Sequence, residues 1–283
     1  MRTGLGQKRT LAGAAIAVTA AGGIVLALAA RSGPAAGTSL TVNLPPPASD
    51  RIYASPVARG RPIVVIDAGH GGRDPGARSV SGEVVEKDLA LALARELRDD
   101  LVKRARVRVA MTRDDDRYLT LDDRAAVARR LNAGLFVSLH MDSAPNPLAR
   151  GASVYSLSDV ASDAEAARFA AAENRGAAAD AATESVQSIL SDLAMRTQMS
   201  ASANLATRLV NKSAGRFELR PQPHRFASFH VLRRAATPAV LFEAGYVSNT
   251  DDEALLRSPQ HRSAIALALA QAIEADIAAR SRH

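Results

Sequence analysis

Short apolar segments alternate with amphipathic helical segments along this chain, and this alternation restricts its fold more than any other feature. Leucines recur every four residues from Leu89 to Leu101, which predicts an amphipathic helix over 86–104. Runs rich in aliphatic and β-branched residues predict strands at 63–67, 107–112, 135–139, 152–157 and 239–243. Such alternation predicts a single α/β domain in which helices cover both faces of a mainly parallel central sheet.

Polar residues at the ends of these segments predict where several helices begin. Thr120 with Asp123, and Ser162 with Glu165, have the spacing of capping boxes, and the second pair precedes an alanine-rich segment. Further elements are predicted in three places: a helix over 183–213, a short strand at 229–232, and a last helix that begins at Ser258-Pro259 and ends near residue 279.

The N-terminal segment has the pattern of an export signal. A basic start precedes residues 11–30, which are apolar and carry no charge. We interpret residues 1–30 as either a cleaved signal peptide or a retained membrane anchor, so the protein contacts a membrane only if this segment stays. Residues 31–60 are rich in Pro, Gly, Ser and Ala and are interpreted as a flexible linker to a domain at 61–283. The expected location is the periplasm or another exported site.

Composition excludes several functional classes. The chain has no Cys, so any metal must be held by His, Asp or Glu. Aromatic residues make up only 4% and Trp is absent, which argues against an aromatic platform for nucleic acid. The formal charge is +7, and loss of Arg2, Lys8 and Arg9 with a signal peptide would leave +4. A mildly basic protein is suited to anionic polymers of the cell envelope.

Polar residues that can bind a metal follow the predicted strands. His70 comes after the strand at 63–67, His140 follows the strand at 135–139, and Glu243 ends the strand at 239–243. Ligands of α/β sheets bind beyond the carboxyl ends of the strands, so these side chains are expected at one edge. Glu86 begins the first helix and returns to that edge. Two imidazoles and a carboxylate are the ligand set of a catalytic zinc ion with one position open.

These residues also have ordinary structural interpretations. A histidine in a glycine-rich loop can be a polar loop residue, and a glutamate at a helix N-terminus stabilises the helix dipole. Glu243 is harder to explain in this way, because a carboxylate near a core costs several kcal/mol unless it is paired or metal-bound. The glycine-rich loop at 69–76 could also bind phosphate, but it lacks the Walker lysine and the dinucleotide spacing.

Taken in order, several short motifs resemble the zinc-dependent N-acetylmuramoyl-L-alanine amidases of bacterial cell walls, in particular the division-associated type. The resemblance covers residues 62–279. The matching motifs are VVIDAGHGGRDPGA (64–77), EKD (86–88), TRDDD (112–116), LFVSLHMDSA (135–144), RGASVY (150–155) and PAVLFEAGYVSN (238–249). Two interpretations from other classes remain open, another zinc peptidase of the cell wall and a non-catalytic wall-binding regulator.

The resemblance implies a function for each residue of the predicted site. His70, Glu86 and His140 would bind Zn²⁺, and Glu243 would be the catalytic carboxylate. The implied substrate is peptidoglycan, cleaved between the lactyl group of N-acetylmuramic acid and L-Ala of the stem peptide. Asp67 and Asp142 flank the ligand histidines and are predicted either to orient them or to cap turns.

The alanine-rich helix belongs to an apparent insertion at about 158–195. Division-associated members of the family carry a helix here that blocks the zinc site until an activator protein moves it. The resemblance therefore implies an activator partner and autoinhibition. Because Glu165 is assigned to the capping box, Glu173 is predicted to be the blocking carboxylate. The alternative is that Glu173 is an exposed helix glutamate.

Overall fold

The computed structural model describes residues 15–19, 23–27, 39–41, 50–177 and 187–281, and these fall into two units, Met1–Pro46 and Pro47–His283. In the first unit, β1 (Ala15–Thr19), β2 (Gly23–Ala27) and β3 (Ser39–Thr41) form an antiparallel sheet. The other residues of the predicted signal or anchor, and residues 31–38 and 42–49 of the predicted linker, lie outside the described residues. Among the helices described, none combines the length and apolarity needed to span a membrane.

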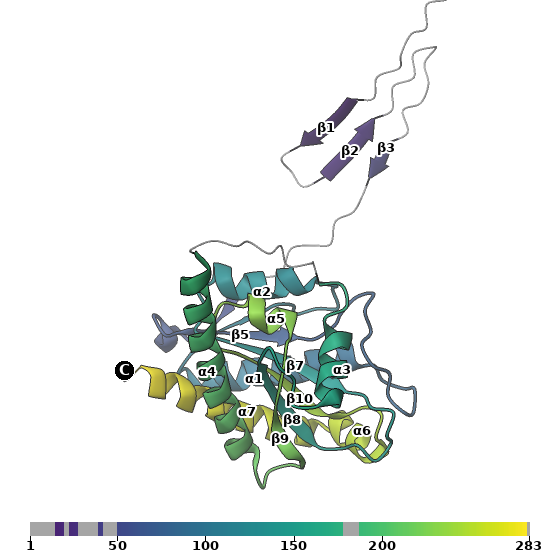
Figure 1. Cartoon of the computed structure of the whole chain (residues 1–283), viewed down its shortest axis with the longest axis vertical. Coiled ribbons are helices and arrows are strands. Elements are labelled where there is room, and N and C mark those ends of the chain that lie inside the picture. Colours follow the sequence, from purple (N-terminus) through teal and green to yellow (C-terminus); the bar gives the residue numbers. More distant parts are fainter. Residues whose placement is uncertain (1–14, 20–22, 28–38, 42–49, 178–186, 282–283) are drawn as a thin grey trace, which may run out of the picture. The chain divides into compact units, whose positions relative to one another are not determined.

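The second unit is built on a seven-stranded sheet with the order β4-β6-β5-β7-β10-β8-β9 (Figure 1). Its strands are β4 (Ile52–Tyr53), β5 (Ile63–Ala68), β6 (Arg108–Met111), β7 (Leu135–Asp142), β8 (Ala152–Leu157), β9 (Leu219–Ala227) and β10 (Ala239–Tyr246). Four of the six neighbouring pairs are parallel, and only β4 with β6 and β8 with β10 are antiparallel. The predicted α/β class with a mainly parallel sheet is confirmed.

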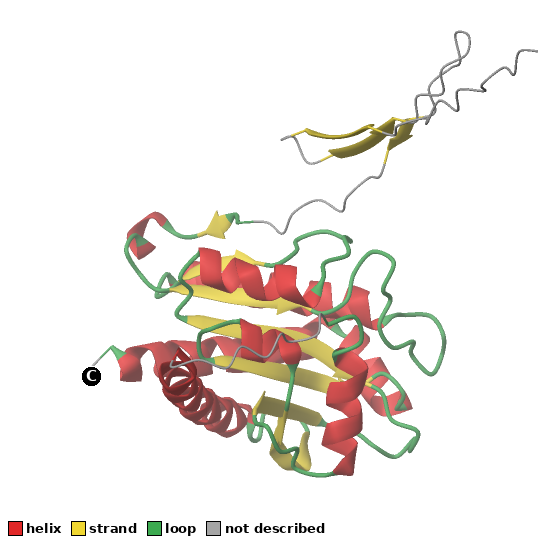
Figure 2. Cartoon of the chain, turned by 45° about the horizontal axis from the view of Figure 1, so that its top comes forward, coloured by secondary structure: helices red, strands yellow, loops and turns green. Residues whose placement is uncertain are grey.

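Helices cover both faces of this sheet, as Figure 2 shows. One core lies under α1 (Glu86–Arg104), α4 (Gln187–Ser213) and α7 (Pro259–Arg280). The other core lies under α2 (Leu121–Arg130), α3 (Ala164–Glu173) and α5 (His230–Arg234). The short helix α6 (Thr250–Arg257) follows β10. Alternate residues of the central strands point into the two cores, so these strands are buried on both sides.

Several predicted helix boundaries agree with the structure. Helix α1 spans the predicted residues, Thr120 and Asp123 form a complete capping box, and Ser258 caps α7. The strand predicted at 229–232 is wrong, because His230–Arg234 forms α5 and the strand is β9, directly before it. Two prolines, Pro221 and Pro223, obscure β9 in the sequence, and they are tolerated because β9 is an edge strand.

The folded domain also begins earlier than predicted. Strand β4 pairs with β6 at one edge of the sheet, and Pro56–Ala58 forms a short 3-10 helix. Both elements lie within the segment interpreted as a flexible linker. The second unit therefore includes residues before 61.

Candidate active site

The carboxyl ends of the central strands bring the predicted site residues to one edge of the sheet. His70 follows β5, while His140 of β7 and Glu243 of β10 are register partners on adjacent parallel strands. Glu86 is the first residue of α1 and is buried. Residues that lie far apart in the sequence are therefore neighbours in the fold.

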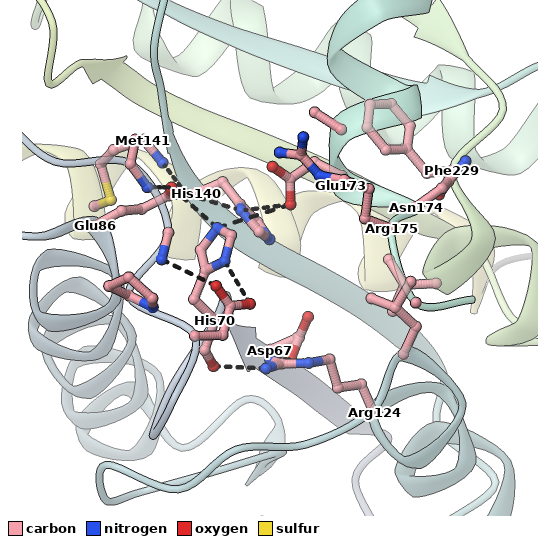
Figure 3. Close-up of a pocket in the computed structure, with 18 of the residues that line it drawn as sticks. Asp67, His70, Glu86, Arg124, His140, Met141, Glu173, Asn174, Arg175 and Phe229 are labelled. Carbon is pink, nitrogen blue, oxygen red and sulfur yellow. Dashed lines mark hydrogen bonds and ion pairs between the residues drawn. The ribbon is translucent and has the colours of Figure 1, made fainter. Parts of the chain in front are cut away.

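Glu86 connects the two histidines (Figure 3). Its Oε2 atom lies 2.9 Å from His70 Nε2, and its Oε1 atom lies 2.9 Å from His140 Nδ1. The backbone N–H of Ala77 donates to Oε2 at 2.9 Å, and that of Met141 donates to Oε1 at 3.1 Å. The carboxylate is thus fixed from both sides, with each oxygen facing one imidazole nitrogen.

The glycine-rich loop allows the backbone to approach these side chains closely. His70 itself has a φ of 57°, in the left-handed region that non-glycine residues seldom adopt. A Cβ atom on Gly69 would lie 2.4 Å from the His140 ring, and one on Gly76 would lie 2.5 Å from Glu86 Oε2. Any side chain at either glycine would displace a site residue.

Two buried arginines, which the sequence reasoning did not select, hold the loop that carries His70. Arg113 donates from Nε to the carbonyl of Ala68 at 2.9 Å and from Nη2 to that of Gly69 at 2.7 Å. Arg124 Nη1 donates to the same Ala68 carbonyl at 2.7 Å and to Asp67 Oδ1 at 2.8 Å. Arg113 lies in the quoted TRDDD motif, which was the signal available in the sequence.

Among the described residues, neither Asp67 nor Asp142 forms a hydrogen bond with a histidine. Asp67 accepts hydrogen bonds from Thr112, Ser138 and Arg124. Asp142 Oδ1 accepts from the backbone of Ser143, which corresponds to the turn-capping alternative. Burial raises the pKa of Asp142 to about 6. A different residue, Asp74, lies 3.0 Å from His70 Nδ1 and orients that ring.

The electrostatics of the cluster favour a cation. Burial disfavours the charged form of both His70 and Glu86, but neighbouring charges oppose this effect at each residue. Glu86 and Asp74 raise the pKa of His70 to about 11, while the two histidines hold the pKa of Glu86 below its ordinary value. A site where carboxylates stabilise positive charge this strongly is suited to a metal ion.

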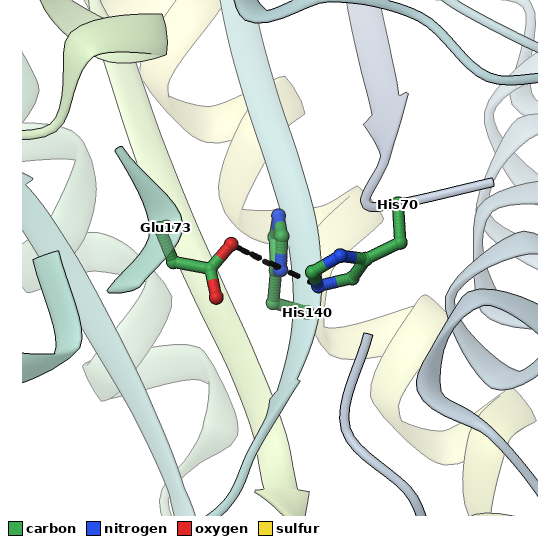
Figure 4. A group of neighbouring side chains, drawn as sticks. All are labelled: His70, His140 and Glu173. Atoms are coloured by element: carbon green, nitrogen blue, oxygen red, sulfur yellow. Dashed lines mark ion pairs between the residues drawn. The ribbon is translucent and has the colours of Figure 1, made fainter. Parts of the chain in front are cut away.

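Glu173 of α3 completes a group of possible metal ligands (Figure 4). Its Oε2 atom lies 3.4 Å from His140 Nδ1 and 3.8 Å from His70 Nε2. Ligands at zinc bond lengths in a tetrahedron are separated by about 3.3–3.6 Å, so these distances are close to those of a metal site. Burial raises the pKa of Glu173. His70 Nε2 is buried and faces the carboxylates of Glu86 and Glu173, which fits a ligand atom.

Glu243 lies next to this group without joining it. It is fully buried, and neither carboxylate oxygen has a hydrogen-bond partner within the part of the chain that the structure describes. Burial raises the pKa of Glu243 well above its ordinary value, and the nearby Asp142, Glu86 and Glu173 raise it further. Glu243 therefore favours the protonated form until a positive charge or a polar partner arrives.

A cavity of about 660 Å³ lies over the histidines, and α3 forms part of its wall through Phe169, Ala172 and Glu173.

Helix α3 does not begin as predicted. Its N-cap is Asp163, whose carboxylate accepts from the N–H of Ala166 at 2.9 Å. The assignment of Glu165 to a capping box with Ser162 is wrong, because the Glu165 carboxylate binds Arg220 of β9 instead.

Comparisons with known proteins identify the family of this chain. Residues 64–275 match the family described as N-acetylmuramoyl-L-alanine amidase, Amidase_3. AmiA, an N-acetylmuramoyl-L-alanine amidase of Escherichia coli strain K12, is 34% identical over 220 residues, which are 76% of this chain and 75% of AmiA. AmiC of Neisseria meningitidis, also an N-acetylmuramoyl-L-alanine amidase, is 34% identical over 220 residues, which are 76% of this chain and 52% of AmiC.

A solved structure gives the same result. The catalytic domain of CwlV, an N-acetylmuramoyl-L-alanine amidase from Bacillus (Paenibacillus) polymyxa var. colistinus, has a TM-score of 0.55 and 28% identity. The match covers 75% of this chain and 96% of that domain. Fold and site together define a peptidoglycan hydrolase. The chain belongs to the N-acetylmuramoyl-L-alanine amidase family, which confirms the predicted enzyme activity.

Proposed function

We propose that this amidase is zinc-dependent and cuts the amide bond between the lactyl group of N-acetylmuramic acid and L-Ala of the stem peptide. His70, Glu86 and His140 would hold the metal. The observation that carries this proposal is the convergence of two imidazole nitrogens on one buried carboxylate, each at 2.9 Å. A zinc ion held there would polarise the scissile carbonyl and make water a stronger nucleophile at neutral pH.

Glu243 is proposed as the general base and acid. Two observations support this role: its register position beside His140, and its carboxylate oxygens, which have no hydrogen-bond partner among the described residues and would be open to a proton from the attacking water. Glu243 then gives that proton to the leaving amine of L-Ala. A cation in the adjacent site would oppose the effect of burial on the pKa of Glu243 and would leave the carboxylate ionised and able to accept the proton.

We further propose that the structure represents an autoinhibited enzyme. The Glu173 carboxylate faces both histidines, where it would take the metal position that the substrate carbonyl needs. Activity then requires that α3 moves, and an activator protein is the proposed cause. An enzyme that cuts the wall only on activation suits daughter-cell separation. We propose an exported, periplasmic location, with residues 1–30 as signal peptide or anchor.

Metal analysis and product identification on the purified full chain test the proposal. We expect one zinc per chain and the release of free stem peptides, with L-Ala at their amino end, from purified sacculi. Activity that survives removal of all metal would contradict zinc dependence. Release of disaccharides or of peptides cut within the stem would contradict the proposed bond specificity.

A further inference from the structure

The N-terminal half of α3 contacts two arginines of the edge strand β9. The Glu165 carboxylate binds Arg220 with both oxygens, Oε1 to Nη1 at 2.9 Å and Oε2 to Nη2 at 3.0 Å. Both oxygens of Asp163, the N-cap residue, lie 2.5 Å from Arg225 Nη2. Two guanidinium groups therefore bind carboxylates from the same helix.

These arginines need anionic partners. The Arg225 side chain is only 4% exposed and that of Arg220 only 19%, so neither charge is fully solvated. Among the described residues, their other hydrogen-bond partners are the hydroxyl groups of Tyr155 and Tyr246, which carry no charge. If α3 moves away from the histidines and takes Glu165 and Asp163 with it, both arginines lose these carboxylates. The departing helix would also uncover both guanidinium groups, and these would be open to carboxylates of another ligand, with which they form charge-assisted hydrogen bonds.

The two arginines lie on the side of the sheet where the reaction is proposed to occur. Leu241, Tyr155 and Arg225 are register partners in one row across β10, β8 and β9. Glu243 lies two residues after Leu241 on β10, and residues two apart in a strand point to the same face. Tyr246, also on β10, contacts both Arg220 and Glu165 through its hydroxyl group. Glu243 and Arg225 therefore lie on the same face of the sheet.

The distance across the sheet fits the length of a stem peptide. Strand β9 is three positions from β7, which carries His140, and neighbouring strands are about 4.8 Å apart, or roughly 14 Å in total. An extended peptide covers this distance in about four residues. Stem peptides of peptidoglycan are acidic and carry free carboxylates within that length.

We propose that Arg220 and Arg225 form a subsite for the carboxylates of the stem peptide, and that Glu165 and Asp163 occupy this subsite in the resting enzyme. The helix then imitates the substrate at two points, since Glu173 faces the histidines at its other end. Glu165 and Glu173 are eight residues apart, about 12 Å along a helix, which is close to the distance across the sheet. This inference rests on the proposed function.

The competing explanation is that the arginines only hold α3 in place. The two explanations differ once the helix has been released. We therefore choose the full chain with Glu173→Ala and Glu165→Gln as the background, and add Arg220→Gln to it. The matched control is Arg150→Gln, which removes an arginine paired with the carboxylates of Glu218 and Asp251, neither of which belongs to α3.

The probes are a muramoyl tetrapeptide with free stem carboxylates and the same compound with these groups amidated. Arg220→Gln should lower kcat/KM for the free acid by about 10- to 100-fold, the range expected for a charge-assisted hydrogen bond, and change the amide by less than about threefold. Arg150→Gln should change neither. Calorimetric binding of the free and amidated tetrapeptides should show the same preference without turnover, and Arg220→Lys should restore part of it.

Equal kcat/KM values with and without Arg220, or equal losses for the acid and the amide, would overturn the subsite. Hydrolysis of the probes would in that case still support the proposed function. A released, folded and zinc-loaded enzyme that cleaves neither probe would overturn the proposed function, and the subsite with it. Thermal unfolding of each variant shows whether it is folded.

Discussion

The two sides of the cavity are held by different kinds of contact. On the histidine side, buried arginines bind main-chain carbonyls and glycines pack directly against the site residues. On the α3 side, the contacts come from side chains: Glu165 with Arg220, Asp163 with Arg225, and Asn174 with the backbone of Ser228 and His230. The first side cannot change without rebuilding the loop, whereas the second can separate by rotating side chains.

Apolar burial is also greater on the histidine side, which includes α1, than on the α3 side. Helix α1 buries Leu89, Leu93, Leu97 and Leu101, and each buried leucine is worth about 1.5–3 kcal/mol. The fully buried residues of α3 are Ala166 and Ala170, and a buried methyl group contributes only about 0.8 kcal/mol. Phe169 adds ring contacts with Tyr155 and Phe229. We therefore call the histidine side of the cavity the permanent side and the α3 side the removable side. Four predictions test this difference.

The largest effect is expected on the permanent side. His70→Ala or His140→Ala removes a proposed metal ligand, so both bound zinc and hydrolysis of sacculi should be lost. Zinc content and stem-peptide release measure this directly. His224→Ala is the control, because His224 bonds Ser156 rather than a site residue. Stoichiometric zinc and full activity in either ligand variant would show that the ligand assignment is wrong.

The second prediction concerns the proposed base. Glu243→Gln keeps the size of the side chain but cannot accept a proton, so turnover should fall by about 10²- to 10⁴-fold while zinc remains bound. Steady-state kinetics and metal analysis of the same preparation give both values. Loss of zinc in this variant would instead identify Glu243 as a ligand and place the base elsewhere.

The third prediction separates the two aspartates near His70. Asp74→Asn removes the carboxylate beside His70 Nδ1, so zinc affinity should fall by about 10- to 100-fold with little change in Tm. Asp67→Asn should mainly lower Tm, because it breaks a buried pair with Arg124. Competition with a chelator and thermal unfolding distinguish them. The reverse assignment of effects would mean that Asp67 orients the histidine.

The smallest effect is expected on the removable side. Glu173→Ala takes away the blocking carboxylate, whose distances of 3.4 and 3.8 Å from the histidines indicate modest contacts, so basal activity without an activator should rise by about tenfold. Arg168→Ala, on the exposed face of α3, is the control. The blocking role fails if folded, zinc-loaded Glu173→Ala is no more active on sacculi than the unchanged enzyme.

The sequence predicts the framework better than the contacts that tune it. Strand and helix periodicity, together with the strand-end rule, is enough to place His70, His140 and Glu243 at one edge. Asp74 and Arg124 could not be selected, because a loop aspartate and a helix arginine look the same whether they face solvent or a ligand. The role of Glu165 was mistaken because local spacing suggested a capping box, whereas its partner, Arg220, lies 55 residues away.

The parallel register of β7 and β10 has a consequence for control of this enzyme. His140 and Glu243 are paired across adjacent strands, so the backbone hydrogen-bond ladder sets the spacing between them. No loop movement can pull these two residues apart, and drawing them out of alignment would mean opening the middle of the sheet. The proposed ligand and the proposed base therefore cannot be separated by a small movement. Control of such an enzyme would act on access to the site, and α3, which forms part of the cavity wall, is an element that can move without opening the sheet.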